Sequence, residues 1–180
     1  MLPPIRSVRG ARLAFTLVEL ITVMAIIALV SGLVLASAAR TNATALTARA
    51  KAELAVICAA LEGYKIVYGD YPRTANAPAL LQSLIGKLGP TQVQIEGRRF
   101  IDMATLATSG DLDPFAATSA ELVDPWGQTY RYAYRSSSPW TQPAFVLFSC
   151  GPDKSAAALL TGGVVDESAT QNRDNVHVLR

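Results

Sequence analysis

The chain has 180 residues and a net charge of +2, from 16 Lys and Arg against 14 Asp and Glu. Its basic residues form no dense cluster, so the sequence does not predict the basic face of a nucleic-acid-binding protein. Hydrophobic residues make up 51% of the chain. The 141 residues after Ala39 (180 minus 39) suit one compact domain.

The N-terminal region has the order of a targeting segment, basic and then apolar. Three arginines and no acidic residue precede Phe15. Residues 20–39 carry no charge, and at about 1.5 Å of rise per residue these 20 positions make a helix of roughly 30 Å, the thickness of a bilayer's hydrocarbon core. We therefore expect a helix that spans a membrane.

Glu19 is a carboxylate directly before this apolar run. A carboxylate within hydrocarbon costs about 2.5 to 3.5 kcal/mol on insertion scales, so it needs a charged partner or a route to the headgroups. The residues alone leave open whether Glu19 has such a partner or lies at headgroup level.

A second interpretation of the N-terminus comes from residues 36–38, Ala-Ser-Ala. These small residues after the apolar run suit a conventional signal peptidase. A cut there would release an exported protein without an anchor. No cysteine lies near the apolar run, which argues against a lipoprotein signal.

After Arg40 an apolar stripe continues with helical spacing. Its members are three or four positions apart: Leu46, Ala50, Leu54, Ile57, Leu61, Tyr64 and Tyr68. Charged residues, Glu53 among them, fall mostly off the stripe. No proline occurs between Pro4 and Pro72, so we expect one helix of over 50 residues that ends at 69–72 (Gly-Asp-Tyr-Pro) and packs on a sheet.

The remaining elements are short. Apolar spacing predicts a second helix over residues 79–88, and alternation suggests a short hairpin within 93–101. Residues 124–127 (Asp-Pro-Trp-Gly) suit a type I turn, and strands are expected at 129–135, 144–149 and 176–179. Short connections favour antiparallel neighbours, so the predicted fold class is α+β, a long N-terminal helix packed on a small antiparallel β-sheet head.

Nothing in the sequence predicts an enzyme. There is one histidine, His177, and no paired metal-ligand spacing or glycine-rich phosphate loop. A histidine alone in a strand is more often structural than catalytic. Cys58 and Cys150 could form one disulfide in an oxidising compartment, or remain buried thiols.

Residues 15–20 read Phe-Thr-Leu-Val-Glu-Leu, after the basic leader and before the apolar helix. This block resembles the processing and assembly signature of the type IV pilin superfamily. The resemblance implies that prepilin peptidase cuts between Ala14 and Phe15 and methylates the new amine, leaving a mature chain of 166 residues (180 minus 14). Ala14 stands where the family usually has glycine, and since alanine is also small we expect slower processing.

The resemblance also implies a partner for Glu19. The cut creates a positive amine on Phe15, and in the family this glutamate pairs with the amine of a neighbouring subunit as helices join a filament. The expected regions are a leader peptide at 1–14, the transmembrane and assembly half of the helix at 15–39, and a pilin-like head at 40–180 that includes the amphipathic half of the helix.

Downstream landmarks resemble one branch of the superfamily, the major pseudopilins (protein G type) of type II secretion systems. In order, these are Tyr-Pro at 71–72, the short helix, the Asp-Pro-Trp-Gly turn with its Tyr-rich strand, and residues 145–153. Residues 91–120 have no clear counterpart. The resemblance therefore spans most of the chain.

Residues 151–175 form a long segment with little periodicity and several oxygen-bearing side chains, which suits either a polar loop or a calcium site. In the major pseudopilins a calcium ion staples the corresponding loop. The resemblance implies Asp153 first, Asp174 next and Asp166 more weakly as possible calcium ligands. This loop departs from the family because residues 156–165 contain no acid.

Together these features predict a structural subunit of a type II secretion pseudopilus that helps move folded proteins across the outer membrane. The expected location is the inner membrane, single-pass, with the head in the periplasm. Expected partners are other pseudopilins in a homo-polymer, prepilin peptidase and an inner-membrane assembly platform, with no nucleic acid. Two alternatives remain: a type IV pilin for adhesion, motility or DNA uptake, and a single-pass anchored or exported binding domain.

Overall fold

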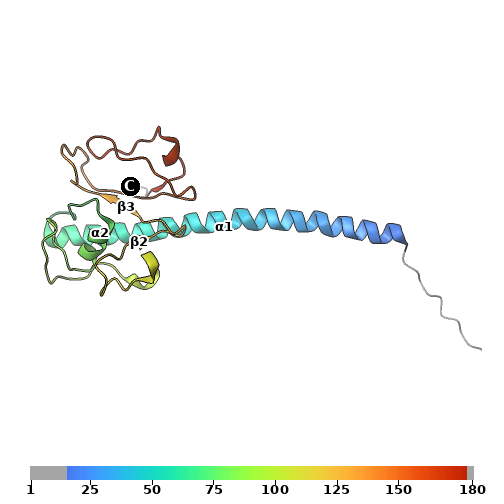
Figure 1. Ribbon diagram of the computed structural model, residues 1–180, viewed down its shortest axis with the longest axis horizontal. Helices are drawn as coiled ribbons and strands as arrows, with labels where there is room; N and C mark the ends of the chain where they lie inside the picture. Colours follow the sequence, from blue (N-terminus) through green and yellow to red (C-terminus); the bar gives the residue numbers. More distant parts are fainter. Residues whose placement is uncertain (1–15, 178–180) are drawn as a thin grey trace, which may run out of the picture. The chain divides into compact units, whose positions relative to one another are not determined.

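The computed structural model of the chain describes residues 16–177, and the side chains of all of these except residues 34–40 and 111. The chain divides into two compact units, Met1–Asn42 and Ala43–Arg180. Helix α1, Leu17–Tyr68, contributes residues to both units (Figure 1).

The predicted long helix is confirmed, since α1 runs without a break for 52 residues. Its end is also where the sequence places it. Gly69 adopts a left-handed conformation, with φ of 80°, and its N–H donates to the carbonyl of Lys65 over 2.7 Å. A left-handed glycine satisfies a free carbonyl of the last turn and stops the helix, and Pro72 follows shortly after.

The apolar stripe of α1 forms the centre of the core in the second unit. Its five middle members have no exposed surface: Ala50, Leu54, Ile57, Leu61 and Tyr64. Figure 1 shows α2 and β3 beside this part of the helix, and side chains from both elements join the same hydrophobic cluster. The predicted packing of a helix stripe on a sheet head is therefore confirmed.

The expectation that Glu53 lies off the buried stripe is wrong, because this side chain is only 5% exposed. Its Oε1 accepts a hydrogen bond from Arg49 Nε over 2.6 Å, and its Oε2 accepts one from the Tyr130 hydroxyl over 2.7 Å. A buried charge is tolerated when it is paired and hydrogen-bonded in this way. Glu53 thus ties α1 to the chain that leads into the sheet.

The second helix lies slightly earlier than residues 79–88. Helix α2 covers Ala77–Leu84, starting after the Asn76 cap, whose side chain accepts from Ala79 N, and with proline in its first turn. Gly86, at φ of 88°, and the cap at Ile85 end it. Leu88, placed in the helix by its apolar spacing, instead forms a β-bridge with Gln94.

The sheets are small and antiparallel, as predicted. A three-stranded sheet has the order β3 (Arg131–Ala133), β4 (Val146–Ser149) and β5 (Val176–His177). A two-stranded sheet pairs β1 (Ala107–Thr108) with β2 (Leu122–Val123). Three single-turn 3-10 helices complete the elements, η1 (Met103–Thr105), η2 (Ser109–Asp111) and η3 (Thr170–Asn172). The expected hairpin within 93–101 is reduced, in the described chain, to the Leu88–Gln94 bridge, and no strand is assigned there.

The predicted turn at 124–127 is confirmed and is anchored by its first residue. Gly127 N donates to the Asp124 carbonyl over 2.9 Å, which closes the turn. The buried Asp124 carboxylate accepts from the backbone N–H of Trp126 and Gln128, and from the Ser149 hydroxyl in β4. The turn is therefore bonded to the neighbouring strand as well as to itself.

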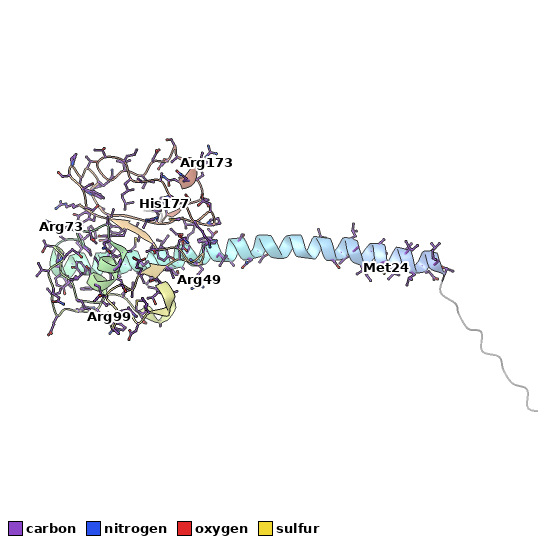
Figure 2. All side chains as sticks on the ribbon, in the orientation of Figure 1. Met24, Arg49, Arg73, Arg99, Arg173 and His177 are labelled. Atoms are coloured by element: carbon purple, nitrogen blue, oxygen red, sulfur yellow. The ribbon has the colours of Figure 1, made fainter. Side chains whose placement is uncertain are left out.

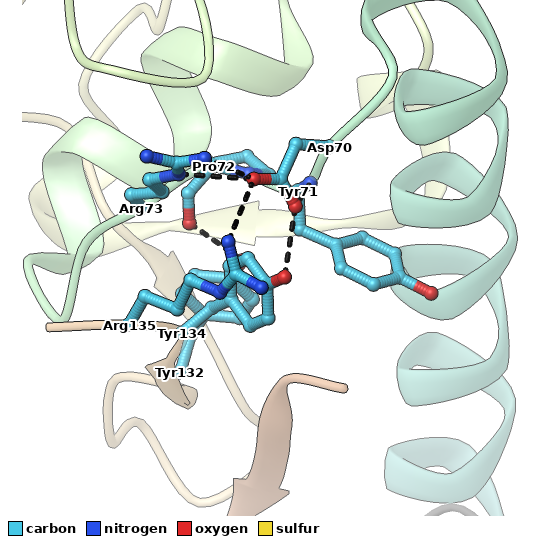
Figure 3. A network of polar contacts seen from close by, with 7 residues as sticks. All are labelled: Asp70, Tyr71, Pro72, Arg73, Tyr132, Tyr134 and Arg135. Atoms are coloured by element: carbon cyan, nitrogen blue, oxygen red, sulfur yellow. Dashed lines mark hydrogen bonds and ion pairs between the residues drawn. The ribbon is translucent and has the colours of Figure 1, made fainter. Parts of the chain in front are cut away.

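A polar network joins the chain after α1 to the end of β3 (Figure 3). Asp70 Oδ2 accepts from Arg73 Nε and Nη2, over 2.9 and 2.7 Å, and lies 3.6 Å from Arg135 Nη1. Asp70 Oδ1 accepts from the Tyr134 hydroxyl over 2.8 Å and from Tyr71 N. One carboxylate therefore fixes the helix end against the sheet.

We predict that Asp70→Asn lowers the free energy of unfolding of the full chain at pH 7 by about 1 to 2 kcal/mol. Burial alone would raise the pKa of Asp70, but hydrogen bonds from Arg73 and Tyr134 outweigh it and hold the pKa below its ordinary value of 3.8. The network therefore stabilises the fold above about pH 4, and this contribution is lost as the pH falls through the lower folded-state pKa.

Denaturant unfolding from pH 7 down to pH 2 measures both effects. The control is Glu96→Gln, which removes an exposed carboxylate of the same unit. A wild-type and an Asp70→Asn stability curve that stay parallel below pH 4 would contradict this role of Asp70.

Candidate functional site

The predicted processing site lies outside the described residues. Ala14 and Phe15 both belong to residues 1–15, so the cut between them stays a prediction. The first described position is Thr16, directly before α1. The site is therefore built from Thr16, Glu19 and the apolar surface that follows.

Thr16 and Glu19 cap the N-terminal end of α1. Thr16 Oγ1 accepts from Glu19 N over 3.2 Å, while Glu19 Oε2 accepts from Thr16 N over 3.1 Å and from the Thr16 hydroxyl over 3.0 Å. This reciprocal arrangement is a capping box, which satisfies two backbone N–H groups that the helix leaves free. The local sequence carries a signal for this box, Thr-x-x-Glu directly before an apolar run.

The apolar side chains of the first unit are widely exposed. Leu17, Leu29 and Leu33 are 74%, 77% and 74% exposed, and the residues between them include further exposed apolar side chains, among them Met24 in Figure 2. A contiguous apolar surface of this kind marks a site of interaction with protein or lipid.

The predicted membrane span at residues 20–39 is only partly described, because the side chains of residues 34–40 are not. Within the part of the chain that is described, no helical stretch is both apolar enough and long enough to cross a bilayer. The membrane span stays a prediction.

The structure brings the backbone of Asp153 against the carboxylate of Asp174, while the Asp153 carboxylate accepts from Ser155 N over 2.8 Å. The backbone N–H of Asp153 donates to Asp174 Oδ2 over 3.0 Å. Gly151 makes this approach possible, because a Cβ at that position would lie only 2.3 Å from the Asp174 carbonyl oxygen. From the sequence, a link between these two ends of the loop is implied by the family resemblance alone.

Asp166 lies in a separate turn of the same loop. Its Oδ1 accepts from the backbone N–H and the hydroxyl of Ser168, over 3.0 and 2.6 Å. In the described chain, no three acidic, histidine or cysteine side chains form a group that could hold a metal ion. The prediction of Asp166 as a calcium ligand gains no support from this geometry.

Asn172 was not singled out as a functional residue, yet it organises the loop between Gly151 and β5. It is 8% exposed. Its Oδ1 accepts from Ala157 N and from Asn175 Nδ2, over 2.9 and 3.0 Å, and its Nδ2 donates to the Asp166 carbonyl over 2.7 Å. One amide thus joins three parts of a segment that lacks regular structure.

The cysteines and the histidine do not form a catalytic arrangement. Both cysteines are thiols, Cys58 half-buried and Cys150 buried. His177 and Cys58 line one polar cavity of about 370 Å³ with Glu167, but the His177 ring packs on Phe148, with 5.3 Å between ring centroids. Burial lowers the pKa of His177, and the negative charge of Glu167 opposes this shift.

The capping box makes a testable prediction. Thr16→Ala removes the side-chain cap and should cost about 0.5 to 2 kcal/mol of local helix stability, whereas Thr16→Ser keeps the hydroxyl and should cost little. Hydrogen exchange of the first-turn amides in the full chain, held in detergent micelles, measures the difference. Equal exchange rates in wild type and Thr16→Ala would show that the box does not hold this end of α1.

Comparison with known proteins gives an independent result. No family model and no solved structure matches the chain. The chain is similar to the type II secretion system core protein G of Pseudomonas aeruginosa, with 27% identity over 168 residues, which are 93% of this chain and 99% of that protein. The match covers both the capped helix and the head, so the resemblance predicted from the sequence is confirmed: this chain has a pseudopilin-like relationship to a core protein of type II secretion.

Proposed function

We propose that this chain is a structural subunit of a type II secretion pseudopilus, and not an enzyme. The observation that carries the proposal is the end-to-end similarity to a core protein G, which extends over 99% of that protein's length. The fold also supports the proposal. Its long helix is suited to assembly, and its small antiparallel head is a separate compact part of the subunit. The exposed apolar surface of the first part of α1 would be buried on assembly, which favours contact between subunits.

Assembly begins with processing. Prepilin peptidase cuts between Ala14 and Phe15, and the new N-terminal amine is methylated. Before the cut, residues 20–39 anchor the chain in the inner membrane with the head in the periplasm. After it, an assembly platform in the inner membrane moves subunits out of the bilayer into a filament of pseudopilins.

The two carboxylate oxygens of Glu19 have different surroundings, which supports two roles for this side chain. Its Oε2 accepts both capping bonds from Thr16, whereas Oε1 accepts no hydrogen bond from the described residues. The carboxylate can therefore cap its own helix and still pair with the Phe15 amine of a neighbouring subunit. A charged pair of this kind lowers the cost of placing a carboxylate next to hydrocarbon.

Two substitutions at one position separate these roles. Glu19→Ala loses both the cap and the charge, while Glu19→Gln keeps an oxygen that can accept the capping bonds but has no charge for the amine. We predict that both variants insert in the membrane and lose most filament formation. The measurements are membrane fractionation and electron microscopy of sheared filaments from cells that make each variant.

Mass spectrometry of the mature N-terminus is the companion measurement, with methylated Phe15 expected in wild type. Normal filaments from Glu19→Gln would refute the charged pair. An intact N-terminus, or a cut near Ala38, would refute the proposed function itself.

We also propose that the head binds one calcium ion at the Asp153–Asp174 junction. The donors suit a hard cation: Asp174 Oδ2 lies 3.0 Å from the Asp153 backbone nitrogen, and the loop also holds Asn175 Oδ1, a buried oxygen that has no hydrogen-bond partner among the described residues. Asp153 and Asp174 would hold the ion by their carboxylates.

Thermal unfolding of the full chain in micelles tests this site. Calcium at a hundredfold excess over its dissociation constant should stabilise the chain by about 2.7 kcal/mol, with magnesium as the control ion. Asp153→Asn should remove the calcium effect, whereas Asp113→Asn, in a different loop, should keep it. No stabilisation of the wild type by millimolar calcium would count against the site.

A further inference from the structure

The sheet has a second apolar face, opposite the core. Tyr132 belongs to the core cluster, so alternation along β3 places its neighbours Arg131 and Ala133 on the other face. Cross-strand register pairs these two residues with Phe148 and Val146 of β4. Ala133 and Phe148 are each only 3% exposed although neither belongs to the core cluster. Something other than the core must therefore cover this face.

The cover is residues 156–159, the first part of the acid-free stretch 156–165, and it leaves a cavity. About 340 Å³ of space lies between this segment and the outer face of β3 and β4. Half of the lining residues are small, because alanine occupies positions 75, 133, 156, 157 and 158. The hollow opens to solvent, and its volume falls in the range of about 300 to 1,000 Å³ that ligand pockets occupy.

The cavity is held open by the loop's own hydrogen bonds. Ala157 N donates to Asn172 Oδ1, and Asn172 is in turn bonded to the Asp166 carbonyl and to Asn175. The covering segment is thus fixed at a distance from the sheet. It does not collapse onto the alanines to fill the space.

One charged side chain lines this apolar cavity. Arg131 is exposed, and it makes no ion pair with any carboxylate of the described residues. By contrast, Arg73 and Arg135, at the nearby helix end, both lie against Asp70. A guanidinium without an acid beside an apolar hollow offers a carboxylate two parallel N–H donors.

We infer that this cavity binds a small apolar molecule that carries a carboxylate. The apolar part lies among Ala133, Ala157 and Phe148, and the carboxylate accepts hydrogen bonds from the Arg131 guanidinium. This site is separate from Glu19 and from the Asp153–Asp174 junction, so it stands or falls independently of filament assembly and of calcium.

The test compares an acid with its matched amide, 4-phenylbutyrate and 4-phenylbutyramide. Each is titrated by calorimetry into the full chain in detergent micelles, with protein-free micelles as the blank. Wild type should bind the acid at least about tenfold more tightly than the amide, because only the acid forms charge-assisted bonds to Arg131. Arg131→Gln should remove this preference and leave amide binding unchanged.

Two further variants complete the design. Lys154→Gln removes a cation from the same loop but outside the cavity lining, and it should bind the acid as wild type does. Ala157→Leu fills the cavity and should abolish binding of both probes, with thermal unfolding to verify that it is folded. The inference is overturned if wild type binds neither probe beyond the micelle blank, or if the acid and the amide bind equally to wild type and to Arg131→Gln.

Discussion

The buried stripe on the second half of α1 is the contact on which the rest of the head depends. Every other element is short, and an isolated two- or three-stranded sheet of two to four residues per strand has little stability of its own. The stripe supplies the apolar surface on which the other elements pack. Tyrosine hydroxyls then join the helix to the rest of the head by hydrogen bonds. Tyr64 donates from the helix to the Leu88 carbonyl, and Tyr130 donates back to Glu53. The sheet therefore gains its order from the helix rather than from its own ladder.

Carboxylates complete this contact at the places where apolar packing ends. Glu53 lies within the helix, Asp70 just after it and Asp124 in the turn before β3, and each accepts bonds from residues distant in sequence. A single carboxylate can accept from several donors at once, so three side chains do the work of many backbone pairs. Removing one donor leaves a carboxylate that is partly buried and lacks a hydrogen-bond partner. These long-range hydrogen bonds help to hold the short strands in register.

The sequence predicts the parts that have a period and misses those that depend on distant partners. The length of α1 and its stripe follow from repeated three- and four-residue spacing over many turns. Glu53 was placed off the stripe because its partner Tyr130 is 77 residues away. Strands β1 and β2 are two residues each, too short for any alternation to be recognised. The Thr16–Glu19 capping box was predictable from local sequence, whereas the link of Asn172 to Ala157 was not, since asparagine in a polar loop carries no directional signal.

The two faces of the sheet explain why residues 156–159 are apolar. These residues would contribute nothing to a calcium site, because none of them has a side chain that can bind the ion. As the cover of Ala133 and Phe148 they are required, since an antiparallel sheet with one face on a helix otherwise leaves apolar side chains in water. The loop thus has two separate tasks, and different residues perform them. The Asp153–Asp174 contact closes its ends, while Asn172 holds its middle over the sheet. The middle is therefore held by an amide network, in which Asn172 Oδ1 accepts from Ala157 N and from Asn175 Nδ2, and not by carboxylates.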